Sequence, residues 1–469
     1  MSDERDTVKS GEIFGHPVGL YVLFFTEMWE RFSYYGMRAI LVFYMTKYLF
    51  LPEHAGGVVG HGGMVHAIEW VFGPQTSQQL SSQIYGIYTG LVYLTPVFGG
   101  IMADQWLGQR KTVIVGGILM AIGHFLMAFS SLFYVALFVL ILGNGAFKPN
   151  VSTQVGALYP PGDPRRDRAY NIFYVGINLG AFLSPIVCGI LGETWGWHWG
   201  FGAAGVGMVC GLLLYIWGQK YLAPDNIMLE AKTTKAEMPA AKPFTSEEWQ
   251  KVGALVVLCL LNVLFWAVYE QQGNTLALWA DGNTNRKMLT LFGSDWEMPA
   301  SVFQAVNPFF IGLFTLGINP LWAWQAKRGT EPNSVAKMAI GCFLLAISFL
   351  IMIGGARVYE SGGLASAWWL IGCTALLTVG EIYLSPVGLS LVTKISPARI
   401  VSLMMGIWLL SSFFGNYLSG YLGTYWEKIT HERFFIWMAG LSAITGVLMI
   451  LFYIPLKRAI GDENEAVER

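Results

Sequence analysis

The chain has 469 residues, of which 54% are hydrophobic and only 13% charged, and its formal net charge at pH 7 is -1. So apolar a composition, with a mean hydropathy of +0.49, excludes an ordinary soluble globular protein. The balanced charge also gives no basis for expecting a nucleic-acid partner. The composition instead predicts an all-α integral membrane protein, because helices satisfy their own backbone groups in lipid.

Apolar runs recur along the whole chain, and most are about 20 residues long, enough to cross ~30 Å of hydrocarbon as a helix. Lys and Arg concentrate in those connections that would face inwards if both termini were cytoplasmic, so we expect that orientation. The first run is too long and too charged for the core of a cleaved signal peptide. In total we expect twelve membrane-spanning helices, near residues 17–48, 80–104, 112–129, 132–155, 168–191, 199–219, 250–280, 301–325, 336–355, 364–393, 400–425 and 433–456.

A short polar stretch divides the chain into two halves. Residues 221–249 contain Ala, Lys and Pro, which suits a cytoplasmic linker between an N-terminal six-helix bundle (1–220) and a C-terminal six-helix bundle (250–469). Transporters built from two such halves place their substrate between them. The five cysteines lie in or beside apolar runs without metal-binding spacing, so neither a metal nor another cofactor is expected.

Several ionisable side chains lie inside the apolar runs, although a charge at the bilayer centre costs at least ~2.5 kcal/mol. They are Glu27, Glu30, Arg31, Arg38, Lys148, Glu270 and Glu381. Four of them fall in the first run, where helical periodicity puts them on one face with Tyr34, and that face is expected to meet a wet cavity. The set has one carboxylate more than its cations. A bound proton would balance it, and so would a sodium ion.

The segment GGIMADQWLGQRKT follows the second predicted helix and includes Gly100, Asp104, Gly108, Arg110 and Lys111. An ordinary basic cytoplasmic turn explains the two cations but not the spaced glycines and the aspartate. We expect the glycines to allow close helix approach and the aspartate to pair with a nearby cation. The pattern resembles the loop signature of the major facilitator superfamily.

Five motifs together resemble one family within that superfamily, the proton-dependent oligopeptide transporters (POT or PTR family). They are the ExxER run EMWERFSYYG at 27–36, GGIMADQWLG at 99–108, FKPNVS at 147–152, FYVGINLGAF at 173–182 and FWAVYEQQG at 265–273. The resemblance implies the major facilitator fold and symport of di- and tripeptides with protons into the cell by alternating access.

The termini of a short peptide offer the same charges whatever its sequence, so a promiscuous site should hold both ends. Arg38 and Lys148 are the candidates for the peptide carboxylate, and the resemblance implies that role for them, with help from Tyr34. It also assigns the amine to Glu381. Further binding roles implied by the resemblance fall on Tyr93, Asn178, Trp266, Asn307, Trp408 and Ser412. From the residues alone, the aromatic side chains could equally be packing or interfacial groups and the asparagines could hold helices together.

The resemblance links proton coupling to Glu27, Glu30, Arg31 and Glu270. Arg31 could also have a purely structural role as the counter-charge of the two nearby glutamates. We expect two salt bridges to gate the transport cycle, Arg38 with Glu270 and Lys148 with Glu381.

The sequence departs from parts of the family. The stretch 221–249 has no room for the two extra helices of many bacterial members, and Gly86 stands where animal members have a histidine. A nitrate or other small-anion carrier is the alternative, although the related plant carriers tend to lose parts of ExxER, which is complete here. The spans contain no HExxH or GxSxG motif, so an enzyme is not expected. We expect a monomer in a bacterial inner membrane.

Overall fold

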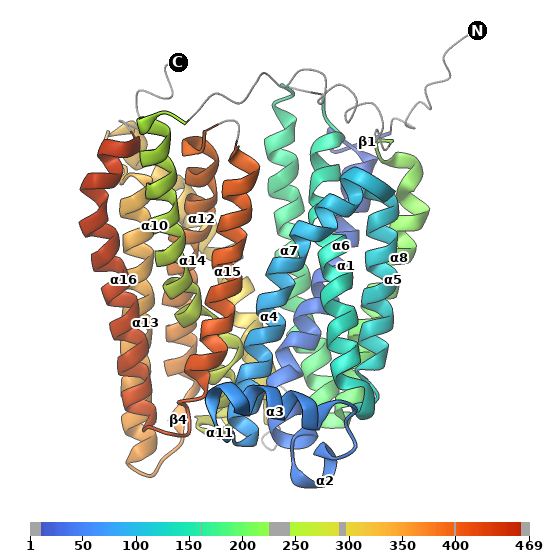
Figure 1. Cartoon of the computed structure of the whole chain (residues 1–469), viewed down its shortest axis with the longest axis vertical. Helices are drawn as coiled ribbons and strands as arrows, with labels where there is room; N and C mark the ends of the chain where they lie inside the picture. Colours follow the sequence, from blue (N-terminus) through green and yellow to red (C-terminus); the bar gives the residue numbers. More distant parts are fainter. Residues whose placement is uncertain (1–10, 161, 225–243, 290–296, 398–399, 461–469) are drawn as a thin grey trace. The chain divides into compact units, whose positions relative to one another are not determined.

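The computed structural model describes residues 11–160, 162–224, 244–289, 297–397 and 400–460. These parts are almost entirely helical (Figure 1). The strands within them form two small ribbons. β1 (Glu12–Ile13) pairs antiparallel with β2 (His16–Pro17), and β3 (Thr284–Asn285) pairs in parallel with β4 (Ala365–Ser366).

The chain forms two compact units. The first comprises Met1–Ala67 and Leu94–Ala241, and the second comprises Ile68–Tyr93 and Lys242–Arg469. The segment 68–93, which the sequence places in the N-terminal half, therefore clusters with the C-terminal half. Most of the predicted linker, residues 225–243, lies outside the described residues.

In the first unit, α1 packs on α7 and α8, and α5 packs on α6 and α8. Figure 1 shows α5, α6 and α8 running along one another. The helices from the start of the chain to the end of this unit are α1 (Val18–Tyr44), α2 (Pro52–Ala55), α3 (His61–Phe72), α4 (Ser77–Met102), α5 (Gln109–Leu126), α6 (Phe133–Ala157), α7 (Arg165–Ile190) and α8 (Trp197–Gly218).

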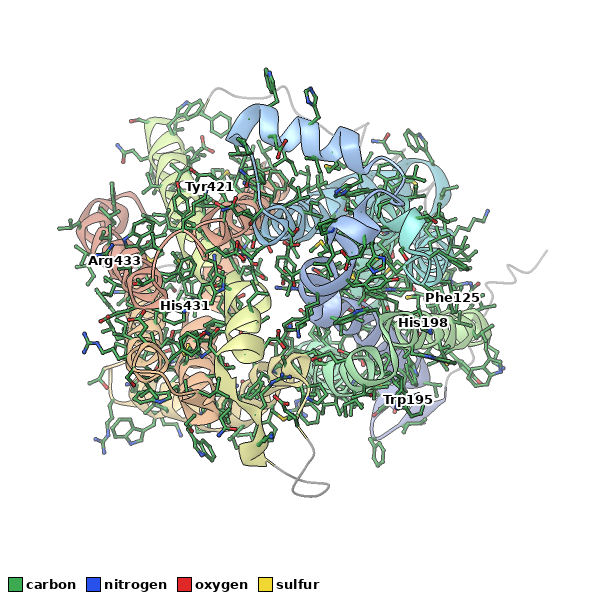
Figure 2. All side chains as sticks on the ribbon, turned by 90° about the horizontal axis from the view of Figure 1, so that it is seen from below. Phe125, Trp195, His198, Tyr421, His431 and Arg433 are labelled. Carbon is green, nitrogen blue, oxygen red and sulfur yellow. The ribbon has the colours of Figure 1, made fainter. Side chains whose placement is uncertain are left out.

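In the second unit, α13 packs on both α14 and α16, and α10 packs on α15 and α16. Its helices are α10 (Ser246–Tyr269), α11 (Thr275–Gly282), α12 (Val306–Lys327), α13 (Ser334–Glu360), α14 (Ala367–Ile395), α15 (Val401–Gly423) and α16 (His431–Ile460). Figure 2 labels Tyr421, in the last turn of α15, and His431, at the start of α16.

Within the described ranges, nine helices are long and apolar enough to cross a membrane. The predicted spans 17–48, 112–129 and 400–425 coincide with α1, α5 and α15, which are not among the nine. α1 is less apolar than the nine because it carries several charged side chains, which are costly to place in a bilayer. The membrane class is therefore confirmed, and twelve spans remain a prediction.

The predicted span 250–280 matches the candidate span Ser246–Gly282, but the helix is interrupted within it. α10 ends at Tyr269, a 3-10 turn covers Glu270–Gly273, and α11 starts after Asn274, whose φ of -116° and ψ of -94° are not helical. Gly and Asn are poor helix formers, and Oδ1 of Asn274 accepts a 2.9 Å hydrogen bond from Oγ of Ser82. The break leaves Glu270 outside the regular helix.

Glycines bring helices of the first unit into backbone contact. A Cβ on Gly180 of α7 would lie 2.2 Å from the carbonyl oxygen of Met28 on α1. Between α4 and α6, a Cβ on Gly99 would lie 1.9 Å from the carbonyl oxygen of Gly145, whereas Gly100 faces open space. Gly99 therefore faces α6 and its neighbour Gly100 does not, because the side chains of successive helical residues point about 100° apart.

Candidate functional site

A buried ion cluster on α1 forms the core of the site in the first unit. Nε of Arg31 lies 3.0 Å from Oε1 of Glu27 and 2.5 Å from Oε2 of Glu30. The amide nitrogen of Asn144 on α6 donates a 3.2 Å hydrogen bond to Oε1 of Glu30. The spacing of Glu27 and Arg31 by one helical turn makes their pairing local, whereas Asn144 is brought in by helix packing.

This cluster is not fully satisfied by the described protein groups. Oε2 of Glu27 and one terminal nitrogen of Arg31 are buried and have no hydrogen-bond partner among the described residues. Buried polar atoms normally have partners, because leaving one unpaired costs about 1–3 kcal/mol. The free carboxylate oxygen is therefore a place where a proton or a water molecule can bind.

Other predicted residues gather around the same cluster. Lys148 on α6 interacts electrostatically with Glu27, Glu30 and Arg38. Arg38 is 6% exposed, and Cζ of Arg31 lies 5.4 Å from the centroid of the Tyr34 ring. The first unit thus collects three cations around two carboxylates, which gives this part of the site an excess of positive charge.

Asn178 on α7 does not share these contacts. Its side-chain nitrogen donates a 2.9 Å hydrogen bond to the carbonyl oxygen of Tyr174, one turn earlier on the same helix. The side chain is half-buried. The hydrogen bond is local to α7, so it neither supports nor opposes the predicted role in peptide binding.

The second unit contains a separate hydrogen-bonded cluster around Glu381 on α14. The Tyr269 hydroxyl donates a 2.5 Å hydrogen bond to Oε2 of Glu381. The amide nitrogen of Asn307 on α12 lies 3.3 Å from the same oxygen, 3.2 Å from the Tyr269 hydroxyl and 2.9 Å from Oγ1 of Thr378. An amide has only two N–H groups, so these three acceptors share them and hold the amide in one orientation.

Tyr269, Thr378 and Asn144 were not identified from the sequence. Thr378 lies three residues before Glu381 and Asn144 four residues before Lys148, so helical spacing could have placed both beside predicted site residues. Tyr269 lies three residues after Trp266 on α10, so the same spacing places it beside a predicted site residue. Its hydrogen bond to Glu381 on α14 has no such local signal.

The remaining predicted residues of the second unit surround this cluster in part. The Trp266 ring meets Tyr269 edge-on at 5.1 Å, and its buried Nε1 has no partner among the described residues. Trp408 of α15 is 5% exposed and packs on Gly388 of α14, where an added Cβ would lie 2.3 Å from its ring.

Three further predicted residues belong to the same unit. Ser412 on α15 is buried, Glu270 is 2% exposed in the turn after α10, and Tyr93 is half-buried on α4. The structure brings Glu381, Asn307 and Trp266 together through Tyr269.

The loop motif after α4 has a well-defined geometry. A π-helical turn (Ala103–Leu107) contains the exposed Asp104, and Gly108 follows with a positive φ of 80°. Arg110 donates hydrogen bonds to the carbonyl oxygens of Ala223, at 3.0 Å, and Leu222. Lys111 is exposed at the start of α5. Arg110 therefore ties the start of α5 to the segment after α8.

The chemistry of the site is that of charge recognition. All five cysteines carry free thiols, and the described residues contain no group of three His, Cys, Asp or Glu side chains suited to a metal ion. The first unit presents buried guanidinium groups and the ammonium group of the half-buried Lys148, which can hold an anion, and the second presents a carboxylate with an oriented amide that can hold a cation.

Comparison with known proteins identifies the family. A POT family model matches residues 110–230 and 224–438. The chain is 32% identical to a di-/tripeptide transporter of Lactococcus lactis subsp. cremoris, over 96% of this chain and 97% of the relative. It is 31% identical to the peptide transporter YePEPT of Yersinia enterocolitica, over 98% and 99% of the two chains.

Solved structures agree. The crystal structure of the peptide transporter POT in complex with sulfate has a TM-score of 0.81 and 30% identity, covering 97% of this chain and 98% of that one. A mutant of POT in complex with alafosfalin has a TM-score of 0.81 and 31% identity, with the same coverage. This chain is therefore a multi-pass membrane transporter that belongs to the POT family.

Proposed function

We propose that this protein carries di- and tripeptides into the cell together with protons, by alternating access. The observation that carries the proposal is the division of charge between the two units. One unit holds the buried Arg38 and the half-buried Lys148, and the other holds the half-buried Glu381 with Asn307. A peptide has an anionic and a cationic end, so each unit can recognise one of them, and the peptide transporters to which the chain is similar support this substrate class.

The peptide carboxylate is proposed to bind Arg38 and Lys148. Arg can donate to both carboxylate oxygens at once, whereas Lys acts as a compact charge. Tyr34, on the same stripe of α1, is proposed to add a hydrogen bond from its hydroxyl. This assignment rests on the burial of Arg38 and on its proximity to Lys148, since the two cations are close enough to interact electrostatically.

The peptide amine is proposed to bind Glu381 and Asn307, with Tyr269 and Thr378 as positioning residues. The Tyr269 hydroxyl fixes one carboxylate oxygen, and Thr378 fixes the amide. The pocket for the rest of the peptide is proposed to include Tyr93, Asn178, Trp266, Trp408 and Ser412. Nε1 of Trp266 is buried without a described partner and is therefore a donor that a bound peptide could satisfy.

The transported proton is proposed to bind within the set Glu27, Glu30 and Glu270, with Arg31 setting the charge of the first two. The buried Oε2 of Glu27, which has no described partner, supports this choice. Adding one proton makes the number of charged carboxylates equal to the number of cations, while a zwitterionic peptide changes nothing. The loaded set is then neutral, whereas the empty set carries one net negative charge. The membrane potential, worth ~2.3 kcal/mol per charge per 100 mV, would therefore act on the empty carrier and drive its return to the outward-facing state.

Two salt bridges are proposed to gate the transport cycle. We propose that Arg38 pairs with Glu270, and Lys148 with Glu381, in the state that closes one side, and that proton and peptide binding release these pairs. The protein is proposed to work as a monomer with twelve spans and cytoplasmic termini in a bacterial inner membrane. Exchange of the two charges at Arg38 and Glu270, with partial recovery of the uptake lost in either single reversal, tests the first pair.

Uptake of radiolabelled di-alanine into proteoliposomes of the purified full chain tests the proposal. An inward proton gradient should drive accumulation, a protonophore should abolish it, and a sodium gradient alone should not replace it. Uptake driven by sodium would overturn proton coupling. Nitrate uptake without peptide uptake would favour the small-anion alternative instead.

A further inference from the structure

The short helix α3 (His61–Phe72) is the longest described helix of the connection between α1 and α4. Its 12 residues span about 18 Å at 1.5 Å per residue, too little to cross ~30 Å of hydrocarbon. In Figure 1 it runs across the direction of α5 and α6 rather than along it. It is therefore not a span, and what its outer face contacts needs a separate explanation.

The outer face of α3 is uncharged. The exposed residues recur every three to four positions and form a single stripe: Gly62, Gly63, His66, Ala67, Trp70 and Val71. Trp70 is 83% exposed and Val71 59% exposed, whereas Ile68 on the opposite side is buried. The stripe contains no Asp, Glu, Lys or Arg, although a helix that faces water normally carries charged residues on its outer side.

Hydrogen bonds place the start of α3 level with the start of a membrane span. The backbone nitrogen of Val59 donates a 3.0 Å hydrogen bond to the carbonyl oxygen of Ser131, and Nδ1 of His61 lies 3.0 Å from the Tyr134 hydroxyl. The rings of His61 and Tyr134 are also stacked. Ser131 and Tyr134 lie at the beginning of the candidate span Ser130–Ala157, so this end of α3 lies beside the first residues of that span.

The other end of α3 lies level with the end of α15 in the second unit. The Phe72 ring lies 5.6 Å from the ring of Tyr421, which belongs to the last turn of α15. This ring contact anchors the C-terminal end of α3 to the last turn of α15.

We propose that α3 is an interfacial helix whose uncharged stripe contacts the lipid headgroups and the first part of the acyl chains. Exposed Trp and Val at this level would be unfavourable in water, whereas Trp is enriched at membrane–water interfaces. Trp and His also combine an apolar ring with a polar tip, which suits that layer. A second copy of the chain is a poorer occupant, because six residues are far fewer than the 20–30 per side of a stable interface.

Spin labelling of the full chain tests this proposal without requiring peptide transport. Cysteine is introduced singly as Trp70→Cys or Val71→Cys in the stripe and as Glu53→Cys on α2, an exposed site of the same connection. The signal of the unchanged chain, whose own thiols are mostly buried, is subtracted. In vesicles of phosphatidylethanolamine and phosphatidylglycerol, the stripe labels should be more accessible to oxygen and less accessible to a water-soluble nickel complex than the Glu53 label.

Two results would overturn the proposal. One is a stripe label as accessible to the nickel complex as the label at Glu53, which would place the stripe in water. The other is spin–spin broadening at Val71 that disappears on dilution with unlabelled protein, which would identify a second copy as the occupant. The two stripe positions are read independently, so failure of one variant to fold leaves the other to decide.

Discussion

The Tyr269 hydroxyl donates a 2.5 Å hydrogen bond to Oε2 of Glu381, across 112 positions of sequence. The Asn307 amide lies within hydrogen-bond reach of both groups and of Oγ1 of Thr378. Glu381 is thus held by neighbours on α10 and α12 before any substrate arrives. In the proposed amine site, this support sets the direction from which an ammonium group can approach the carboxylate.

We expect Tyr269→Phe to raise the KM for di-alanine by about 10-fold to 100-fold, because a hydrogen bond to a charged group contributes about 1.5–3 kcal/mol. Uptake at several concentrations measures this. Tyr383→Phe is the matched control, since Tyr383 is on the same helix as Glu381 but packs on Trp322. N-acetylated di-alanine, which lacks the ammonium group, should respond much less to Tyr269→Phe. An equal loss for both peptides would indicate a general structural role.

We expect Glu30→Gln to abolish uptake driven by a proton gradient while some counterflow exchange of peptide persists. The amide cannot take up a transportable proton, but it still fits between Arg31 and Asn144. Glu27→Gln should behave in the same way. Uptake and exchange in the same proteoliposomes measure the two activities. Wild-type uptake by Glu30→Gln that a protonophore still collapses would remove this residue from the proton pathway.

We expect Arg31→Met to destabilise the protein by about 3–5 kcal/mol, because two buried carboxylates lose their counter-charge. Thermal unfolding in detergent would show a lower midpoint. The triple variant Glu27→Gln, Glu30→Gln, Arg31→Met removes the stranded charges as well and should recover part of the loss. A single Arg31→Met variant as stable as the unchanged chain would show that the pairs contribute little.

We expect Gly99→Ala to destabilise the packing of α4 on α6 by about 1–3 kcal/mol or more, since the added methyl group would lie 1.9 Å from a backbone oxygen. Gly100→Ala is the natural control, because a Cβ there meets nothing within 4 Å. Unfolding midpoints of the two variants should therefore differ, with Gly100→Ala close to the unchanged chain or above it. Equal midpoints would show that the two helices can separate at little cost.

We expect acid to weaken the attachment of α3. Burial lowers the pKa of His61 below its ordinary value of 6.5, so the folded state binds a proton less readily than the unfolded state. The contribution of His61 to stability is therefore complete above pH 6.5 and is lost as pH falls through the folded-state pKa.

Unfolding midpoints measured on both sides of pH 6.5 would show this. His61→Phe keeps a ring against Phe50 and Tyr134 but does not titrate, so it should flatten that part of the pH profile. His66→Phe, on the exposed stripe of the same helix, is the control. A profile of His61→Phe that matches the unchanged chain would contradict the prediction.

Much of the membrane class and of the first unit's cluster could be predicted from sequence. Long apolar runs can only be helices in lipid, and helical spacing alone puts Glu27 and Arg31 within reach of each other. The five motifs led to the POT family, which the comparisons confirmed. The break after Tyr269 could not be predicted, because the apolar run continues through it and the bond from Ser82 to Asn274 comes from α4.

The sequence by itself determined which ionisable residues stand in its apolar segments and which of them share one face of α1, because apolar run length and helical period are local properties. Only the tertiary structure decided which groups hold them. Tyr269 reaches Glu381, Asn144 reaches Glu30, and α3 lies beside the start of α6. These contacts depend on the rotation and packing of helices distant in the chain, which no local pattern specifies.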